Sequence, residues 1–295
     1  LGAHRGRGLT TVGHLGDQAN WFDPAPPAVD DAARAALVEA LLEQPGDLLL
    51  LDELPGDGEF VRAIAARRPD AQILEGPATY RIAPGTERRR RSLSARRREV
   101  GRLTRRAAER GTPLAVTAEG SWEAIRAHLP ELLAMQEEAW KGRDPDDFTG
   151  TSQGRSFVAA AITALGTEGR VRLVRVEVGG RLAAFHLALV TGRRAILYKT
   201  AFDRALTGLP GLGWCSLLAM IDRLEAEGVT DIDLGPWGGG YKAHIADPEP
   251  TVTIRLALSA PGRAYLVAAR AKRGAQRGLS ALVARPRGGG RAGSG

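Results

Sequence analysis

The first eighty residues alternate short apolar runs with amphipathic stretches. The four leucines from Leu48 to Leu51 have the length of a buried strand, and Pro45–Gly46 ends the helix before them. Asp30 or Asp31 can cap that helix at its N-terminus. The predicted elements are one or two short strands within 9–15, a loop ending at Pro24, Pro26 and Pro27, a helix to residue 43, a strand at 48–51, a helix at 59–66 and a strand at 71–74. This order is typical of an alternating α/β half-domain.

An arginine-rich segment separates this half from the rest of the chain. Pro84–Gly85 closes the first half, Thr86 can cap a helix, and Gly111 ends it. The few apolar positions of the segment recur at spacings of seven, three and four, which places them on one stripe of a helix. These positions are Leu93, Val100, Leu103 and Ala107. We expect a helix at 86–110 that packs along this stripe and bridges the two halves.

The remaining pattern predicts a second α/β half with the order β-α-α-β-β-β-α-β-loop-β. Two hairpin turns, at Gly179–Gly180 and Gly192–Arg193, join three successive strands. The predicted elements are a strand at 114–117, a helix from the Ser121 cap to Trp140, a loop at 144–148, a helix at 153–165, strands at 171–178, 182–190 and 195–200, a helix at 212–227 ended by Gly228, and strands at 231–234 and 252–258.

Composition agrees with a folded chain without a membrane span. The protein has 295 residues, of which 43% are apolar and 25% charged. The longest apolar stretches, 157–165 and 214–221, are well short of the roughly 20 residues that a membrane helix needs. The single cysteine, Cys215, cannot form an internal disulfide or a multi-thiolate zinc site. No basic-then-apolar leader precedes the first strand, so we expect a cytoplasmic protein, and the initial Leu1 indicates that the true start lies upstream.

The net charge of +7 is unevenly distributed. Residues 88–110 hold eleven arginines against Glu99 and Glu109, and residues 251–295 hold nine basic side chains and no acidic one, so each segment carries +9. The rest of the chain is acidic. Clustered positive charge of this kind favours a surface that binds phosphate groups. A solvated helix face followed by a disordered tail is the alternative interpretation.

Several catalytic motifs are missing from the sequence. It contains no G-x-S-x-G elbow, no H-E-x-x-H pair, no G-K-[ST] phosphate loop and no Cys/His cluster. These absences argue against metal catalysis and nucleotide hydrolysis.

Scattered residues of the second half together resemble a known family. They are Ser92 to Arg98, Trp140, Gly180 to Ala184, Asp203, Pro210–Gly211, Gly228, Asp233 to Gly235 and Tyr241–Lys242. With the element order, they resemble the GNAT acyltransferase fold, in its CelD-like branch of paired GNAT domains related to Fem-type aminoacyl-tRNA-dependent ligases. The resemblance implies an α/β (α+β) fold with two GNAT-like domains, the N-terminal copy being incomplete. It divides the chain into a partial domain at 1–85, a basic bridging helix at 86–110, a catalytic domain at 111–260, a basic helix at 261–286 and a disordered tail at 287–295.

The resemblance also implies a donor-binding turn. GNAT enzymes hold a pyrophosphate on Q/R-x-x-G-x-G/A at a strand-to-helix turn, where free backbone amides and the helix dipole favour anions. Here Gly208 to Gly213 reads Gly-Leu-Pro-Gly-Leu-Gly, with the two later glycines in register and glycine in place of Gln/Arg. Arg204 can supply the missing side chain. The implied donor-binding residues are Arg204, Gly211, Leu212, Gly213 and Trp214. A plain helix-entry turn is the alternative.

Acyl transfer by direct attack needs a polarised carbonyl and a proton donor for the leaving group. By the resemblance, Tyr241 is the acid, Asp203 the orienting or basic carboxylate, and Lys242 the anchor for the leaving group or an acidic acceptor. The implied substrate-binding residues are His186, Tyr198, Asp233 and Trp237. A histidine in the middle of a strand, such as His186, can instead be a structural residue whose ring is hydrogen-bonded within the fold. Asp233 can simply bond the glycine loop that follows it.

Three functions remain open from the sequence. The first is an N-acyltransferase that uses acetyl-CoA or another acyl-CoA, without a metal, on a small-molecule or peptide amine. The second uses an aminoacyl-tRNA donor, gripped through phosphates by Arg97, Arg98, Arg105 and Arg106, to form an amide or peptide bond. The third is a non-catalytic module that binds nucleic acid or an acidic membrane through the basic helices. The sequence determines neither the acceptor nor the oligomeric state.

Overall fold

The computed structural model describes residues 2–6, 8–13, 30–82, 87–140, 151–203, 205–206, 211–236 and 239–283. These residues form two compact units. The first unit holds the described residues up to Leu74 and from Thr253 onward, and the second holds those of Glu75–Val252. Among the described residues, no helix has both the length and the hydrophobicity needed to cross a membrane.

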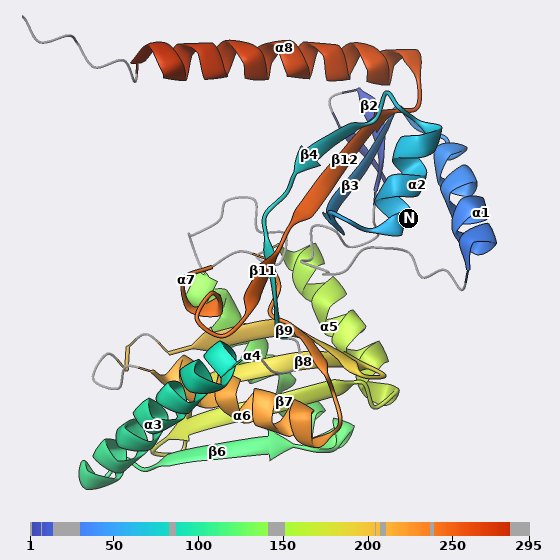
Figure 1. Ribbon diagram of the computed structural model, residues 1–295. Coiled ribbons are helices and arrows are strands. Elements are labelled where there is room, and N and C mark those ends of the chain that lie inside the picture. The colour runs from blue at the N-terminus through green and yellow to red at the C-terminus, as the bar shows by residue number, and fades with distance from the viewer. Residues whose placement is uncertain are drawn as a thin grey trace, which may run out of the picture. The chain divides into compact units, whose positions relative to one another are not determined.

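The first unit contains a five-stranded sheet with the order β1-β2-β3-β12-β4. β1 (Gly2–Gly6) is antiparallel to β2 (Leu9–Gly13), which runs parallel to β3 (Leu48–Pro55). The other strands are β12 (Thr251–Ala257) and β4 (Gln72–Glu75). Its helices are α1 (Asp31–Leu42), α2 (Glu59–Arg67) and α8 (Ala260–Val283), as Figure 1 shows.

Local sequence explains the start of two of these helices. The Asp30 carboxylate accepts from Ala33 N at 2.7 Å and caps α1, as the sequence predicted. Ser259 Oγ accepts from Gly262 N at 3.2 Å and donates to Asp47 Oδ1, which ties the start of α8 to the residue before β3. Position 262 requires glycine because a Cβ there would lie 1.8 Å from the carbonyl oxygen of Asp47.

The second unit contains a seven-stranded sheet with the order β11-β5-β10-β9-β8-β7-β6. β6 to β9 are successively antiparallel, whereas β10 runs parallel to β9. The strands are β5 (Thr79–Ile82), β6 (Leu114–Glu119), β7 (Val171–Val178), β8 (Arg181–Thr191), β9 (Arg194–Phe202), β10 (Asp231–Asp233) and β11 (Asp247–Glu249). The helices are α3 (Glu87–Glu109), α4 (Trp122–Trp140), α5 (Ser152–Thr167), α6 (Leu212–Ala226) and α7 (Gly239–Lys242).

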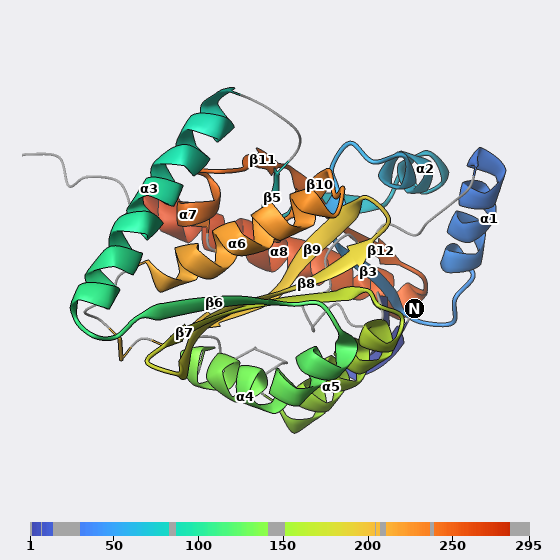
Figure 2. The same ribbon diagram turned by 90° about the horizontal axis from the view of Figure 1, so that it is seen from below.

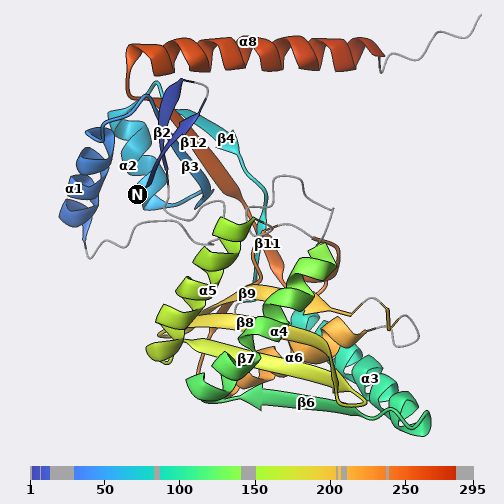
Figure 3. The same cartoon turned by 180° about the vertical axis from the view of Figure 1, so that it is seen from behind.

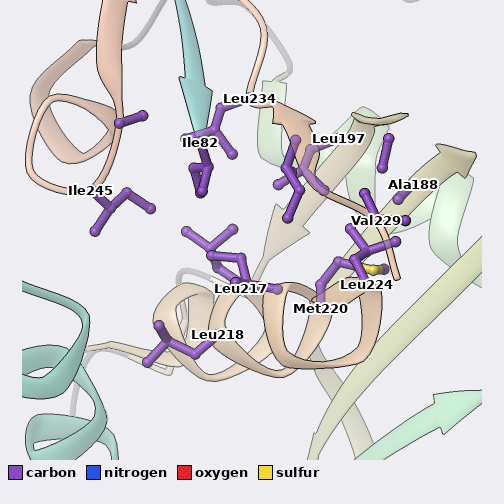
Figure 4. Packing of buried hydrophobic residues seen from close by; sticks show 14 of the residues in the cluster. Ile82, Ala188, Leu197, Leu217, Leu218, Met220, Leu224, Val229, Leu234 and Ile245 are labelled. Atoms are coloured by element: carbon purple, nitrogen blue, oxygen red, sulfur yellow. The ribbon is translucent and has the colours of Figure 1, made fainter. Parts of the chain in front are cut away.

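Helices cover both faces of the second sheet. Figures 2 and 3 show α4 and α5 on one face, and Figure 2 shows α3 and α6 on the other. On the α6 face, Leu217, Met220 and Leu224 pack against the strands, as Figure 4 shows. On the opposite face, α4 and α5 pack on Phe185 and Leu187 of β8. The sheet is therefore buried on both sides, which explains the nearly continuous apolar run of β8.

The arginine-rich helix packs along the predicted stripe. Leu93, Leu103 and Ala107 are buried and Val100 is partly buried, so these positions face the core of the second unit. Leu103 and Ala107 belong to the same cluster as Leu212, at the start of α6. α3 thus contacts α6 and β6 and is part of the second unit.

Most predicted elements are present within one to four residues, including the antiparallel series from β6 to β9. Three short strands, β1, β5 and β11, were not predicted, because strands of three to five residues carry too few positions to show a period. The last predicted strand, placed in the domain 111–260, is β12, and it lies in the first unit between β3 and β4. Strand pairing over such a sequence distance leaves no local signal. The predicted loop at 144–148 and the tail at 287–295 lie outside the described residues.

Candidate active site

The second sheet changes from antiparallel to parallel pairing between β9 and β10, the strands that precede the predicted site residues Asp203 and Tyr241. β10 pairs in parallel with β9 only at Asp231–Arg194, Ile232–Ala195 and Asp233–Ile196. Residues 197–202 of β9 continue beyond the last of these pairs, while the chain after Asp233 turns away into the 234–236 segment. Residues 197–202 of β9 therefore have no pairing partner in β10. Ends of parallel strands in α/β sheets are common positions for ligand sites.

β9 also contains a bulge in this open part. Leu187 pairs with Lys199 and Ala188 with Leu197, so Tyr198 is the extra residue of β9. Tyr198 is buried in the cluster that α4 and α5 form with the sheet, and burial raises its pKa above the ordinary value of a phenol. The Lys199 ammonium lies 4.7 Å from the centre of the Tyr198 ring and is also buried. Tyr198 is thus on the α4/α5 face of β9. Lys199 was missed because a lysine within a strand pattern is ordinarily solvent-exposed.

Gly211 opens α6 in a left-handed conformation, with φ 105° and ψ 6°. Its carbonyl accepts from Trp214 N at 2.9 Å and from Cys215 N at 3.2 Å, which closes the first helical turn. The first amides of any helix lack intrahelical acceptors, and Gly211 has no side chain to cap them. Leu212 is buried against α3, so only its backbone is available at the turn. Arg204, Gly208 and Pro210 lie outside the described residues.

Asp233 ends β10 and holds the turn that follows it. Its Oδ1 accepts from Gly235 N at 2.7 Å and from Thr79 Oγ1 of β5 at 2.8 Å, and the side chain is buried. Gly235 has a φ of 74°, which favours glycine at this position. These contacts correspond to the structural alternative considered for Asp233, a strand-end carboxylate that bonds the glycine loop.

Lys242 is the last residue of α7 and is buried. Its Nζ donates to Gly235 O at 3.0 Å and to Pro236 O at 2.8 Å. The turn after β10 is therefore held by two buried charges, the Asp233 carboxylate that precedes it in the sequence and the Lys242 ammonium that follows it. Trp237, predicted to bind the substrate, lies outside the described residues.

His186 of β8 faces α6 and is fully enclosed. Its Nδ1 lies 2.9 Å from Ser216 Oγ and 3.5 Å from Thr200 Oγ1. Each hydroxyl directs its single proton to a backbone carbonyl, Ser216 to Gly213 O and Thr200 to Phe185 O. Donation by both hydroxyls to these carbonyls suits the tautomer in which Nδ1 carries the proton and Nε2 the lone pair.

The electrostatics keep this imidazole neutral. Desolvation, and secondly the charge of Lys242, lower the pKa of His186 to about 3. His186 therefore does not take up a proton near neutral pH. Because the charge of Lys242 lowers the pKa of His186, the ammonium and the imidazole lie close enough to interact electrostatically. Ser216, which contacts the ring through its hydroxyl, was missed, although a serine on the apolar face of a helix is a recognisable signal.

Tyr241 lies beside the first turn of α6. Its ring meets the Trp214 ring edge to face, with centroids 5.8 Å apart and an angle of 86° between the planes. The residue is 36% exposed, yet desolvation raises the pKa of its hydroxyl above the ordinary value. The hydroxyl stays protonated at neutral pH, as a general acid must before it acts.

Asp203 has contacts of a different kind. Its Oδ1 accepts from Ala205 N at 2.8 Å in a turn of the Asx type, and its Oδ2 lies 3.9 Å from the exposed Arg181 guanidinium. Its backbone amide bonds Ala183 O of β8. Within the described part of the chain these interactions tie Asp203 to the end of β9, and no hydrogen bond joins it to Tyr241 or Lys242.

The four arginines predicted to bind tRNA are on α3. Arg97 is ion-paired with Asp222 of α6. Arg98, Arg105 and Arg106 are exposed, and none of the three is paired with a described acidic side chain. Within the part of the chain that the structure describes, these three cations are therefore available on the outer surface of α3.

The fold therefore brings together Gly211, Trp214, Tyr241, Lys242 and His186. Tyr198 lies on the other face of β9, and Asp203 and Asp233 are occupied by turn contacts. The described residues contain no group of three or more His, Cys, Asp or Glu side chains that could hold a metal ion.

Comparison with known proteins identifies this arrangement. A family model described as the acetyltransferase (GNAT) domain matches residues 94–243, half of the chain. This chain belongs to the GNAT acetyltransferase family. The matched range of this GNAT protein runs from α3 through β9, α6 and β10 to Lys242 of α7, so it includes all the residues that the fold brings together.

Solved structures show the same fold at low sequence identity. A conserved protein of unknown function from Bacteroides thetaiotaomicron is 13% identical, with a TM-score of 0.54, over 76% of this chain and 75% of that one. The C-terminal domain of a predicted lysylphosphatidylglycerol synthetase from Agrobacterium fabrum is 14% identical, with a TM-score of 0.50, over 82% and 78% of the two chains. A search of curated proteins finds no match to this sequence. The chain is thus a mixed α/β protein of the GNAT fold, and its family supports acyl transfer as its general activity.

Proposed function

We propose that this GNAT protein transfers an acyl group from an acyl-CoA to an amine by direct attack. The observation that carries the proposal is the left-handed Gly211 at the start of α6, a turn in which Gly213 lies close to Phe202 at the end of β9. No described side chain caps the first amides of α6, and free helix amides suit the pyrophosphate of CoA. Among the described residues, a Cβ at Gly213 would meet nothing closer than Phe202 Cδ1 at 3.7 Å, an ordinary contact distance.

In the proposed reaction the amine nitrogen attacks the thioester carbonyl and forms the new C–N bond. The C–S bond then breaks, and the departing thiolate takes the proton of the Tyr241 phenol. The nitrogen gives up one proton, which returns to the phenolate directly or through water. The raised pKa of Tyr241 keeps the acid protonated, and desolvation of the hydroxyl is the cause of that shift.

Lys242 and His186 have supporting roles in this proposal. The Lys242 ammonium provides positive charge next to the leaving thiolate while it holds the 235–236 turn. His186 presents Nε2 as a neutral acceptor that binds an N–H group of a substrate. A proton acceptor with a pKa of about 3 is too weak to serve as the base, so we assign His186 to binding. Asp203 remains a candidate base only if a substrate displaces its turn contacts.

The test is turnover of acetyl-CoA by the whole protein, followed through release of the CoA thiol with amines such as spermidine, an aminoglycoside and free amino acids. Tyr241→Phe should lower kcat by about 100-fold with little change in the KM for acetyl-CoA, in line with general-acid contributions. Tyr265→Phe is the matched control, because Tyr265 is an exposed tyrosine of the first unit. An effect of Tyr241→Phe confined to KM would contradict the acid role.

An aminoacyl-tRNA donor is the second candidate, favoured by the exposed Arg98, Arg105 and Arg106. Each phosphate contact releases counterions, so log K should fall with log salt by about 0.7 to 0.9 per contact. RNA would therefore bind with a steep salt slope and acyl-CoA with a shallow one. Changing Arg98, Arg105 and Arg106 to Glu should abolish only a tRNA-dependent reaction. A steep slope with charged tRNA, together with no binding of acetyl-CoA, would overturn our preference.

A further inference from the structure

Trp214 connects the arginine-rich helix to the proposed acid. It is in the first turn of α6, and its ring has two partners on other elements. The Arg96 guanidinium of α3 lies over the ring, 4.7 Å from its centre, and Tyr241 of α7 makes the edge-to-face contact at 5.8 Å. Arg96 is itself held by Glu99 at 2.7 Å. A continuous series of contacts thus runs from Glu99 through Arg96 and Trp214 to Tyr241.

We propose that Trp214 is a positioning residue that fixes the ring of Tyr241, and that Arg96 fixes Trp214. This inference rests on the proposed function, because it assumes that Tyr241 is the acid. It differs from the prediction that Trp214 binds the donor, and it gives Arg96 a role unlike that of an anion-binding arginine.

Three observations support it. First, no hydrogen bond from a described residue engages the Tyr241 hydroxyl, so the ring contact is what orients this side chain. Second, Trp214 is partly buried against the α6 core, which makes it a rigid support for an exposed residue. Third, a cation over one part of the ring and an aromatic edge at another match the charge distribution of an indole, which is negative on its faces and positive at its edge.

The positioning also accounts for the environment of the phenol. The indole excludes water from one side of Tyr241, in agreement with the desolvation that raises its pKa. Among the described residues, the cation that lies over the Trp214 ring is Arg96 of α3, and Lys242 directly follows Tyr241 in α7. Both remain when Trp214 alone is changed, so a change in the titration of Tyr241 would then report hydration.

The first test is a double-mutant cycle on release of thiol from acetyl-CoA, with water or spermidine as acceptor. Trp214→Leu should lower kcat about tenfold, the upper end of what an edge-to-face pair is worth, with KM for acetyl-CoA within twofold. Trp214→Phe keeps a ring and should restore most of the loss. Arg96→Met should lower kcat a few-fold, whereas Arg102→Met, an exposed position on the same helix, should leave it unchanged. In a Tyr241→Phe background, Trp214→Leu should cause no further loss.

The outcomes separate the inference from the proposed function. If Tyr241→Phe lowers kcat but Trp214→Leu does not, or if Trp214→Leu raises only KM, the positioning role of Trp214 is wrong and Tyr241 can still be the acid. An equal loss from Trp214→Leu with and without Tyr241 also overturns the positioning role. If Tyr241→Phe turns over at the wild-type rate, both the acid role of Tyr241 and the positioning role of Trp214 are wrong.

A second measurement does not require turnover. The ultraviolet difference between wild type and Tyr241→Phe during alkaline titration isolates the ionisation of this phenol among the four tyrosines. Trp214→Leu should move that ionisation to lower pH, toward the ordinary value of about 10, and Trp214→Phe should move it less. An unchanged titration in a folded Trp214→Leu protein would contradict the contact as the cause of the desolvation.

Discussion

Two glycines at the start of α6, Gly211 and Gly213, should respond to alanine in opposite directions: alanine should destabilise the protein at one position and stabilise it at the other. Gly211 has a φ of 105°, a region that residues with a Cβ rarely adopt. A Cβ there would lie 3.6 Å from Leu103 Cδ2, an ordinary contact, so backbone strain is the dominant cost. We expect Gly211→Ala to lower the free energy of unfolding by about 1–3 kcal/mol.

Gly213 is the matched control within the same turn. It lies inside α6, is not among the positive-φ glycines, and a Cβ would be 3.7 Å from Phe202 Cδ1. Alanine there should stabilise by about 0.4–1 kcal/mol, because it restricts the unfolded chain and favours the helix. The two variants should therefore differ by about 1.4–4 kcal/mol, the sum of the two effects.

Urea denaturation and thermal unfolding measure this difference. For a unit of this size, 1 kcal/mol corresponds to about 2–4 °C in Tm. The donor adds an independent readout: if the turn holds the pyrophosphate, Gly213→Ala should raise the KM for acetyl-CoA even though the protein is more stable. A Gly211→Ala protein as stable as wild type would refute the left-handed turn, and a destabilised Gly213→Ala protein would refute the space assigned beside Phe202.

The remaining predictions concern the buried polar groups. Because the folded pKa of His186 is about 3, below the unfolded value of about 6.5, stability should fall as pH decreases through 6.5, by about 2 kcal/mol between pH 7 and pH 5. His186→Asn should remove that part of the pH dependence in urea titrations, and an unchanged dependence would show that the imidazole is not held neutral. Lys242→Met leaves two turn carbonyls without their donor and should cost about 1–3 kcal/mol. In that variant the pKa of His186, followed by NMR, should rise but stay below 6.5, since desolvation is the larger cause. Asp233→Asn keeps an Oδ1 acceptor for Gly235 and Thr79 and should retain most stability and turnover, whereas Asp233→Ala should lose about 1–3 kcal/mol. A stable but inactive Asp233→Asn protein would mean that the carboxylate charge has a chemical role.

The sequence by itself determined most of the secondary structure of the second unit. Gly179–Gly180 and Gly192–Arg193 define the hairpins, and apolar runs of strand length define β7 to β9. The stripe of Leu93, Leu103 and Ala107 fixed which side of α3 is buried, because a 3.6-residue period is a local property. The position of Gly211 at the start of α6 also followed from local signals, since a glycine between a strand and a helix is readable without tertiary contacts.

Only the tertiary structure decided the partners of the site residues. Trp214 was read as a donor contact, yet its ring lies between Arg96 and Tyr241, which are 118 and 27 residues away in the sequence. The tautomer of His186 depends on Ser216 of α6 and Thr200 of β9, and its pKa depends on burial and on Lys242. β12 belongs to the first sheet although it follows the elements of the second. Such contacts arise from packing between distant segments, and no periodicity along the chain encodes which distant residue will be the neighbour.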